Sequence, residues 1–405
     1  MVLTVTPTYT ISGTVKNPNG IIIPTVTIGV NGNQTLLTDA KGNYNYTAIA
    51  NSNNIIMPSK TNDKTVANGV NGTDISLIQS HILKKVILNS PYKLIAADVN
   101  GDAAINGTDI ALIKSLILKR ITKFTGNRLW AFVDSNYKFP VPTKPFPLYD
   151  SINIAAINAN QTGKSFVGVK LGDVNFDWNA AVLGIGNRET SIELFNENIS
   201  VNNTATEIRV PIKVKNFKNI MGMQYTLNFN SDVLELKSVG NNQLGADYNM
   251  DFAGEGKIPF LWVDAANQSR TLADSTVLFE LVFNKKGNFT KEDIGLSSDI
   301  TSVNAFDGNY STVGIIKVGG GITENMVTLN NFKVYPNPAK EELTIKGVHI
   351  REVQVIDNMG RVISARQLKD ATNPNINVSS LSAGTYHLLV KTIEGRISMV
   401  GFVKE

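Results

Sequence analysis

Hydrophobic and polar residues alternate along most of the chain, which is the pattern of half-buried β-strands. Strands are predicted in this way within 8–50 and repeatedly within 207–284, where EIRVPIKVKNF and TVLFELVFN are clear examples. Asn, Gly and Asp separate the runs, and Asn31-Gly32 is a strong hairpin signal. Short strands at such spacing predict β-sandwiches, and we expect three, at 1–58, 186–322 and 330–405.

Only two segments have the 3.6-residue period of an amphipathic helix, and they are copies of one another. NGTDISLIQSHILKK (71–85) and NGTDIALIKSLILKR (106–120) match at 11 of 15 positions and lie 35 residues apart. Such an internal repeat indicates a duplicated structural unit. The fold class predicted is therefore mainly β and multidomain, with one small helical module inside 59–185, a segment that also has a β-rich extension.

The loop before the second helix places oxygen-bearing side chains at alternating positions. Positions 1, 3, 5, 9 and 12 are occupied by Asp98, Asn100, Asp102, Asn106 and Asp109, and Ala104 at position 7 can offer its carbonyl. Calcium takes six to eight oxygen ligands, and this spacing wraps a loop around one ion. The pattern predicts a calcium site at 98–109.

The corresponding first loop is degenerate. Asp63, Asn71 and Asp74 hold positions 1, 9 and 12, and Thr65 and Gly69 are the remaining candidate donors. We expect a weaker or rearranged site there. Further along, DVNFD (173–177) resembles the start of the second loop, so it either supplies extra ligands to the first loop or simply forms a turn that ends a strand.

An Asp at position 12, followed by one apolar helix and present in two copies, resembles the dockerin type I repeat. This resemblance implies calcium as cofactor and a cohesin as partner. It also implies that the contacts lie near the loop exit and helix, at residues Thr108, Lys114 and Ser115 or Thr73, Gln79 and Ser80.

Residues 186–322 resemble a cohesin module. The resemblance rests on NIMGMQYTLNF, SDVLELKSV and IPFLWVDAA. Cohesins bind dockerins through one face of the sandwich, so the two modules could pair within one chain or between chains. The short link between residues 178 and 190 disfavours pairing within one chain, and we expect a contact in trans. Trp262 is either a core residue or a platform for a polysaccharide.

The last segment, 330–405, is very similar to the type A C-terminal sorting domain of the type IX secretion system of Bacteroidota. The motifs are Tyr335-Pro336-Asn337-Pro338, Asp357 with Gly360-Arg361, and LSAGTY (381–386). The resemblance implies export, with the outer-membrane translocon and its shuttle protein as partners, and a location outside a Gram-negative cell. Gly319-Gly320-Gly321 marks a linker before it. At the other end, ISGTV and TDAKGNY resemble a carboxypeptidase-regulatory-like module, which implies a structural role.

Composition narrows the range of functions. The 405 residues carry a formal net charge of +4 with no basic stripe, which argues against nucleic acid. No apolar run is long enough to span a membrane, and no signal peptide is visible. With 0 Cys and 3 His, no nucleophile–base set can be assembled, so we expect no enzyme activity.

The sequence therefore predicts a non-enzymatic, calcium-stabilised protein of the scaffold or adhesion type, secreted or held at the cell surface. Two alternatives stay open. The chain could be the C-terminal, non-catalytic part of a larger secreted hydrolase, or a carbohydrate-binding adhesin.

Overall fold

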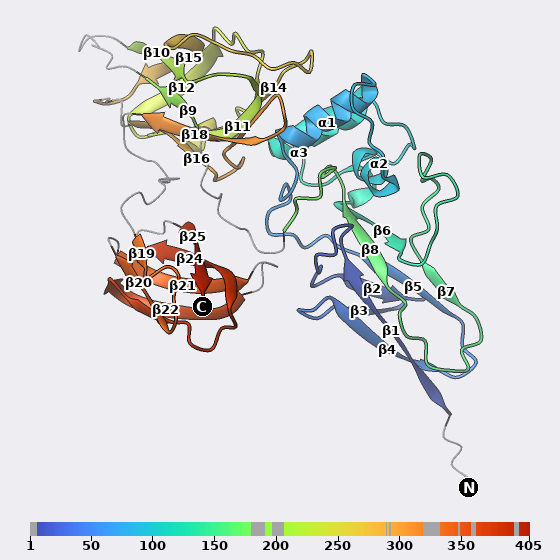
Figure 1. Cartoon of the computed structure of the whole chain (residues 1–405). Helices are drawn as coiled ribbons and strands as arrows, with labels where there is room; N and C mark the ends of the chain where they lie inside the picture. Colours follow the sequence, from blue (N-terminus) through green and yellow to red (C-terminus); the bar gives the residue numbers. More distant parts are fainter. Residues whose placement is uncertain are drawn as a thin grey trace.

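A computed structural model describes residues 6–179, 191–196, 206–288, 290, 293–318, 333–346, 349–357, 362–392 and 397–405 (Figure 1). Within these ranges the protein is mainly β, as predicted, with three α-helices gathered in one module. The expected linker at Gly319–Gly321 and the turn at Gly360-Arg361 lie outside the described residues. Among the described helices, none is both long enough and apolar enough to cross a membrane.

The N-terminal sandwich is built from two four-stranded sheets, in the orders β4-β1-β8-β6 and β3-β2-β5-β7. Strand β5 shows why these residues form a sheet, because its residues are buried and exposed in strict alternation. The strands are β1 (Thr8–Lys16), β2 (Thr27–Val30), β3 (Gln34–Leu37), β4 (Asn43–Ile49), β5 (Asn54–Ser59), β6 (Trp130–Asp134), β7 (Ile152–Ile154) and β8 (Phe166–Lys170).

The expected boundary at residue 58 differs from this architecture. Strands β6, β7 and β8 follow the helical module in the chain but complete both N-terminal sheets, with β8 pairing parallel to β1. The sandwich is therefore discontinuous, and the helices are inserted between β5 and β6. Local alternation could not show this, because these pairings join segments about 100 to 150 residues apart.

The helical insertion consists of α1 (Gly72–Ile82), α2 (Pro91–Ala97) and α3 (Gly107–Ile117), followed by the short 3₁₀ turn η1 (Thr125–Asn127). Both α1 and α3 begin with a capping box, in which an Asn at the N-cap accepts from the backbone and an Asp three residues later accepts from the N-cap N–H. Their buried apolar residues belong to the same hydrophobic core as the N-terminal sandwich.

The second sandwich follows one hydrogen-bonded path in the order β12-β15-β10-β9-β18-β17-β11-β14-β13, and β16 also pairs with β11. Its core includes the fully buried rings of Tyr225, Phe260 and Trp262. The elements are β9 (Ser191–Phe195), β10 (Glu207–Lys215), β11 (Ile220–Phe229), β12 (Leu234–Gly240), β13 (Asp247–Tyr248), η2 (Ala253–Glu255), β14 (Lys257–Val263), β15 (Thr276–Lys285), β16 (Ile294–Ser297), β17 (Asn304–Asp307) and β18 (Thr312–Val318).

The C-terminal sandwich packs a three-stranded sheet, β19-β20-β23, against a four-stranded sheet, β22-β21-β24-β25, around a small core of its own. Its strands are β19 (Lys333–Tyr335), β20 (Glu342–Lys346), β21 (His349–Asp357), β22 (Val362–Thr372), β23 (Asn375–Asn377), β24 (Gly384–Thr392) and β25 (Ile397–Lys404).

Candidate functional site: two carboxylate loops and a docked helix

The loop before α3 is folded around its own carboxylates. Asp98 Oδ1 accepts from the N–H of Gly101 at 2.7 Å, and its Oδ2 accepts from Ala103 at 2.9 Å. Asp109 Oδ1 accepts from Val99 at 3.0 Å, while its Oδ2 accepts from Asn106 at 3.0 Å. These contacts bring the two ends of the predicted twelve-residue loop together.

The start of α1 is closed by a different segment from the one expected. Asp74 Oδ1 accepts from the N–H groups of Val174 at 2.9 Å and Asn175 at 3.3 Å. Asn71 Nδ2 donates to Asp177 Oδ2 at 3.3 Å. The segment 173–177 therefore meets the N-terminus of α1, although about a hundred residues separate them in the chain.

The two arrangements correspond residue by residue. Asp173 accepts from the N–H groups of Asp177 and Trp178, just as Asp98 accepts from those of Asp102 and Ala103. The fourth position has a positive φ in both, 60° at Phe176 and 81° at Gly101. Positions 1, 3 and 5 of the first site are thus occupied by Asp173, Asn175 and Asp177. Positions 9 and 12 remain Asn71 and Asp74.

Gly69 supplies the remaining corner of this composite loop. It has φ of +79°, and a Cβ there would lie 2.9 Å from Asp173 Oδ2 and 2.7 Å from Trp178 Cβ. Because Gly69 precedes Asn71 by two residues, as Ala104 precedes Asn106, its carbonyl occupies loop position 7. The close approach of the two segments requires a residue without a side chain.

Asp63, expected at position 1 of the first loop, has other partners. Its Oδ2 accepts from Lys170 Nζ at 2.7 Å and from Trp130 Nε1 at 2.7 Å, and Lys60 lies 3.5 Å from its other oxygen. Both Asp63 and Lys170 are almost completely buried. They form an ion pair that joins the start of the helical insertion to β8. Among the described residues, no hydrogen bond connects the side chain of Thr65 with Asp74.

Burial makes it costly to keep the carboxylates of both loops ionised. It raises the pKa of Asp74 well above its usual range, and the negative charges of Asp173 and Asp177 raise it further. Burial, with a further contribution from Asp177, likewise raises the pKa of Asp173 to about 7. The pKa of Asp109 is also raised, mainly by burial. A nearby cation would relieve this cost.

Among the residues that the structure describes, no three Asp, Glu, His or Cys side chains form a ready metal centre. Each loop instead combines three Asp with two Asn side chains and one backbone carbonyl. Oxygen-only donors of this kind are the ligands that calcium takes, so the donor chemistry of both loops fits that ion.

Helix α1 lies against the second sandwich, as Figure 1 shows. Gly72 N donates to Gln224 Oε1 at 2.9 Å, and a Cβ at Gly72 would lie 3.0 Å from the ring of Phe306 and 3.3 Å from Val263. The hydrophobic core of the helical module extends across the interface. It includes four side chains of the second sandwich, those of Met221, Leu261, Val263 and Phe306.

A polar network crosses the middle of this interface. Ser76 Oγ donates to Asn267 Oδ1 at 2.6 Å, and Asn267 Nδ2 donates to Ser80 Oγ. Ser80 also shares a hydrogen bond of 2.6 Å with Tyr310 Oη. Ser76 and Ser80 are fully buried, which requires that their hydroxyl groups be paired.

The edge of the interface carries longer side chains. Gln79 donates to the carbonyl of Ala265, and Lys85 Nζ donates to Ala266 at 3.0 Å. From the second repeat, Lys114 forms an ion pair of 2.9 Å with Asp247. Arg120, Leu118 and Ile117 add hydrogen bonds to Tyr248, Asn249 and Thr301.

The expectation that a short link disfavours pairing within one chain is wrong for this structure. Asn179 and Ser191 border the link, and twelve residue steps can span roughly 40 Å when extended. The two modules lie side by side and are joined by hydrogen bonds from Gly72 and Ser76. Of the expected contact residues, Gln79, Ser80 and Lys114 touch the second sandwich, whereas Thr108 is exposed.

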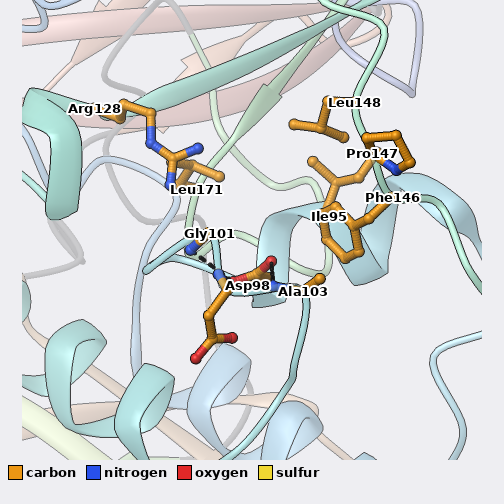
Figure 2. Close-up of a pocket in the computed structure, with 10 residues that line it drawn as sticks. Ile95, Asp98, Gly101, Ala103, Arg128, Phe146, Pro147, Leu148 and Leu171 are labelled. Carbon is orange, nitrogen blue, oxygen red and sulfur yellow. Dashed lines mark hydrogen bonds between the residues drawn. The ribbon is translucent and has the colours of Figure 1, made fainter.

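A cavity of about 510 Å³ opens beside the second loop. Figure 2 shows Phe146, Pro147 and Leu148 on one side and the Arg128 guanidinium over Gly101 on the other. Its ten lining residues include no Ser, Cys, His or Glu. The cavity lining therefore offers no serine or cysteine nucleophile and no histidine base.

Three family models match the chain. Residues 65–118 match the dockerin type I domain, residues 197–318 match the cohesin domain, and residues 333–400 match the secretion system C-terminal sorting domain. This is a secreted modular protein. The predicted dockerin, cohesin and sorting-domain resemblances are thereby confirmed, and no catalytic domain is among the matches. The carboxypeptidase-regulatory resemblance stays a prediction.

Among the solved structures similar to the chain are cohesins. A type I cohesin–dockerin complex from Clostridium thermocellum is 18% identical over 32% of this chain and 96% of that one, with a TM-score of 0.26. The seventh ScaB type I cohesin of Pseudobacteroides cellulosolvens is 21% identical over 32% and 90%, with a TM-score of 0.27. No curated protein matches the chain.

Sequence reasoning missed the cohesin side of the interface. Gln224, Asn267 and Tyr310 lie in three separate segments that only the folded sandwich brings together. For the composite loop at the start of α1 the sequence did offer a signal, the resemblance of 173–177 to the second loop, although this did not show where the loop forms.

Proposed function

We propose that this chain is a non-enzymatic cell-surface or secreted protein whose dockerin domain binds its own cohesin domain, and that calcium holds the resulting unit together. The observation that carries the proposal is the interface at α1, where a buried polar network and a continuous apolar core join the two domains.

Two calcium sites belong to this proposal. The second-repeat site uses Asp98, Asn100, Asp102, the carbonyl of Ala104, Asn106 and Asp109. The first-repeat site uses Asn71, Asp74 and the carbonyl of Gly69 together with Asp173, Asn175 and Asp177, which replace Asp63 and Thr65. Because the six donors of the first site come from two distant segments, calcium there would join the dockerin domain to the loop that follows β8.

Calcium would act on docking through the first turn of α1. Asn71 and Asp74 belong to the proposed site, and Gly72 between them donates to Gln224 of the cohesin domain. A cation that fixes this turn fixes the helix in the orientation that the cohesin domain contacts. Extracellular modules need calcium affinities of only about 10⁻⁴–10⁻³ M for this purpose.

The C-terminal domain supplies the route to the cell surface. Its match to a sorting domain supports passage through the type IX translocon and contact with the outer-membrane shuttle protein. The docked unit would then be the part presented outside the cell.

A polysaccharide-binding role through Trp262 lacks support. Only 2% of Trp262 is exposed, and its ring packs against Phe217 within the cohesin core. A flat sugar needs an accessible aromatic face, which this residue does not offer.

The test is calcium calorimetry on the intact chain, stripped of calcium beforehand. We expect two ions per chain. Asp173→Asn combined with Asp177→Asn should leave one, and Asp102→Asn combined with Asp109→Asn should leave the other. Two undiminished sites in the first variant would contradict the composite site, and no calcium heat in the unaltered chain would contradict calcium stabilisation altogether.

A further inference from the structure

The cohesin domain contacts the two duplicated helices to different extents. The side of α1 is buried against it from Gly72 to Ser80, whereas α3 meets it only through its C-terminal end. Around Gly107, the counterpart of Gly72, no atom lies within 4 Å of a Cβ position. Ala111, the counterpart of Ser76, is exposed. Repeats that match at 11 of 15 positions could in principle exchange places, so something must select α1.

The repeats differ at four positions, three of which lie at the interface. They are the pairs Ser76/Ala111, Gln79/Lys114, His81/Leu116 and Lys85/Arg120. In three of the four pairs, at least one member contacts the cohesin domain, and the fourth pair serves local packing. There His81 Nδ1 accepts from Leu88 N, and Leu116 is completely buried.

We propose that the Ser76/Ala111 and Gln79/Lys114 differences determine which repeat binds, so that the dockerin domain docks in one orientation only. This inference rests on the proposed docking within the chain. It assigns these four residues a role in selectivity, which the shared residues Gly72 and Ser80 cannot have because both repeats contain them.

On the cohesin domain, the residue that distinguishes the two repeats lies in a rigid turn. Asn267 has φ of 51°, its N–H donates to the Asp264 carbonyl at 2.9 Å, and Asp264 is itself held by Arg270 at 2.5 Å. The turn presents Asn267 Oδ1 as a buried acceptor with a fixed position. A hydroxyl at position 76 satisfies it, and an alanine would leave it unpaired.

Exchanging the repeats would break both selective contacts at once. Ala111 would then stand opposite Asn267 with no hydroxyl to donate, and Gln79 would stand opposite Asp247 with no charge to pair with it. In the observed orientation Ser76 meets Asn267 at 2.6 Å and Lys114 meets Asp247 at 2.9 Å. One orientation therefore satisfies both partners, and the other satisfies neither.

The test compares two mirror-image variants of the full chain in calcium by hydrogen-exchange mass spectrometry. The first, Ser76→Ala with Gln79→Lys, makes the first repeat resemble the second. The second, Ala111→Ser with Lys114→Gln, does the reverse. Each introduced residue already occurs at the corresponding position of the other helix, so neither change should prevent the helices from forming.

The first variant should raise amide exchange in the cohesin segment 264–270 by roughly tenfold or more, because a buried acceptor loses its donor. The second variant should leave exchange there within roughly twofold, since it removes only a partly exposed ion pair. Peptides from β10 and β15 report whether the cohesin domain remains folded.

Three results would overturn the proposal. Exchange at 264–270 could be unchanged in the first variant, or it could rise equally in both. The first variant could also keep this segment protected while new protection appears at 107–111 on α3, which would show that the repeats are interchangeable.

Discussion

Replacing Gly72 with alanine should weaken docking, because the new methyl group has no room. Its position lies 3.0 Å from the ring of Phe306, which is buried to 1% exposure. The same edge of this ring also lies against Gly222, where a Cβ would overlap it, so the ring is closely packed on this side. Overpacking of this kind costs about 1–3 kcal/mol.

The repeat provides a matched control. Gly107 occupies the same first-turn position of α3, and nothing lies within 4 Å of its Cβ direction. Alanine should be neutral or stabilising there by up to about 1 kcal/mol, because it restricts the unfolded chain. The same gain applies at Gly72, so the difference between the two variants isolates the contact with the cohesin domain.

Hydrogen exchange of α1 and β14 in the intact chain is the assay. With about 1.4 kcal/mol for each tenfold change, the expected cost of Gly72→Ala corresponds to a loss of protection between about 5-fold and 150-fold. Gly107→Ala should cause no loss. Equal behaviour of the two variants, with the interface still protected, would refute the argument that Gly72 is a docking contact.

Three further predictions follow from the buried charges and polar groups. Lys170→Met should destabilise the N-terminal sandwich by up to about 3–5 kcal/mol, because it leaves the buried Asp63 with only the more distant Lys60, at 3.5 Å, as a cation. Thermal unfolding should show this loss and a partial recovery when Asp63→Leu is added, and no loss in the single variant would contradict the prediction. The second prediction concerns pH in the presence of chelator. The pKa of Asp173 is raised to about 7 from its ordinary value of 3.8, so its contribution to stability is fully present below pH 3.8 and is lost as the pH rises through about 7. The thermal midpoint without calcium should therefore decrease as the pH is raised from 5 to 8, and an increase over this range would contradict the prediction. Tyr310→Phe should weaken docking by about 0.5–1.5 kcal/mol through loss of the hydrogen bond to Ser80, as measured by exchange at 76–80, and unaltered exchange there would count against this contact.

The sequence predicted the helices of both repeats because their signals are local. Each helix begins one residue after the start of its repeat, at Gly72 and Gly107, with the preceding Asn as N-cap. Helix α2 was not predicted, because seven residues with no side-chain cap carry too little periodicity.

The composite loop and the docking arrangement could not be predicted in the same way. Asp63 has the sequence position of the first calcium ligand, but its carboxylate forms an ion pair with Lys170 instead. Segment 173–177 reaches Asp74 only because β8 pairs with β1 and β6, which is a contact between distant parts of the chain. Spacing along a sequence identifies a ligand pattern but not which segments the fold brings together.

The most direct test of docking within the chain is zero-length cross-linking of Lys114 to Asp247, whose charged atoms lie 2.9 Å apart. Light and heavy isotope-labelled full-length chains would be mixed, treated with a carbodiimide in calcium, and digested for mass spectrometry. The account predicts an abundant Lys114–Asp247 cross-link whose two peptides always carry the same label, with a lower yield in chelator. Mixed-label pairs at about half of the product would show that the cohesin and dockerin domains bind between chains, and the absence of the cross-link would contradict the interface itself.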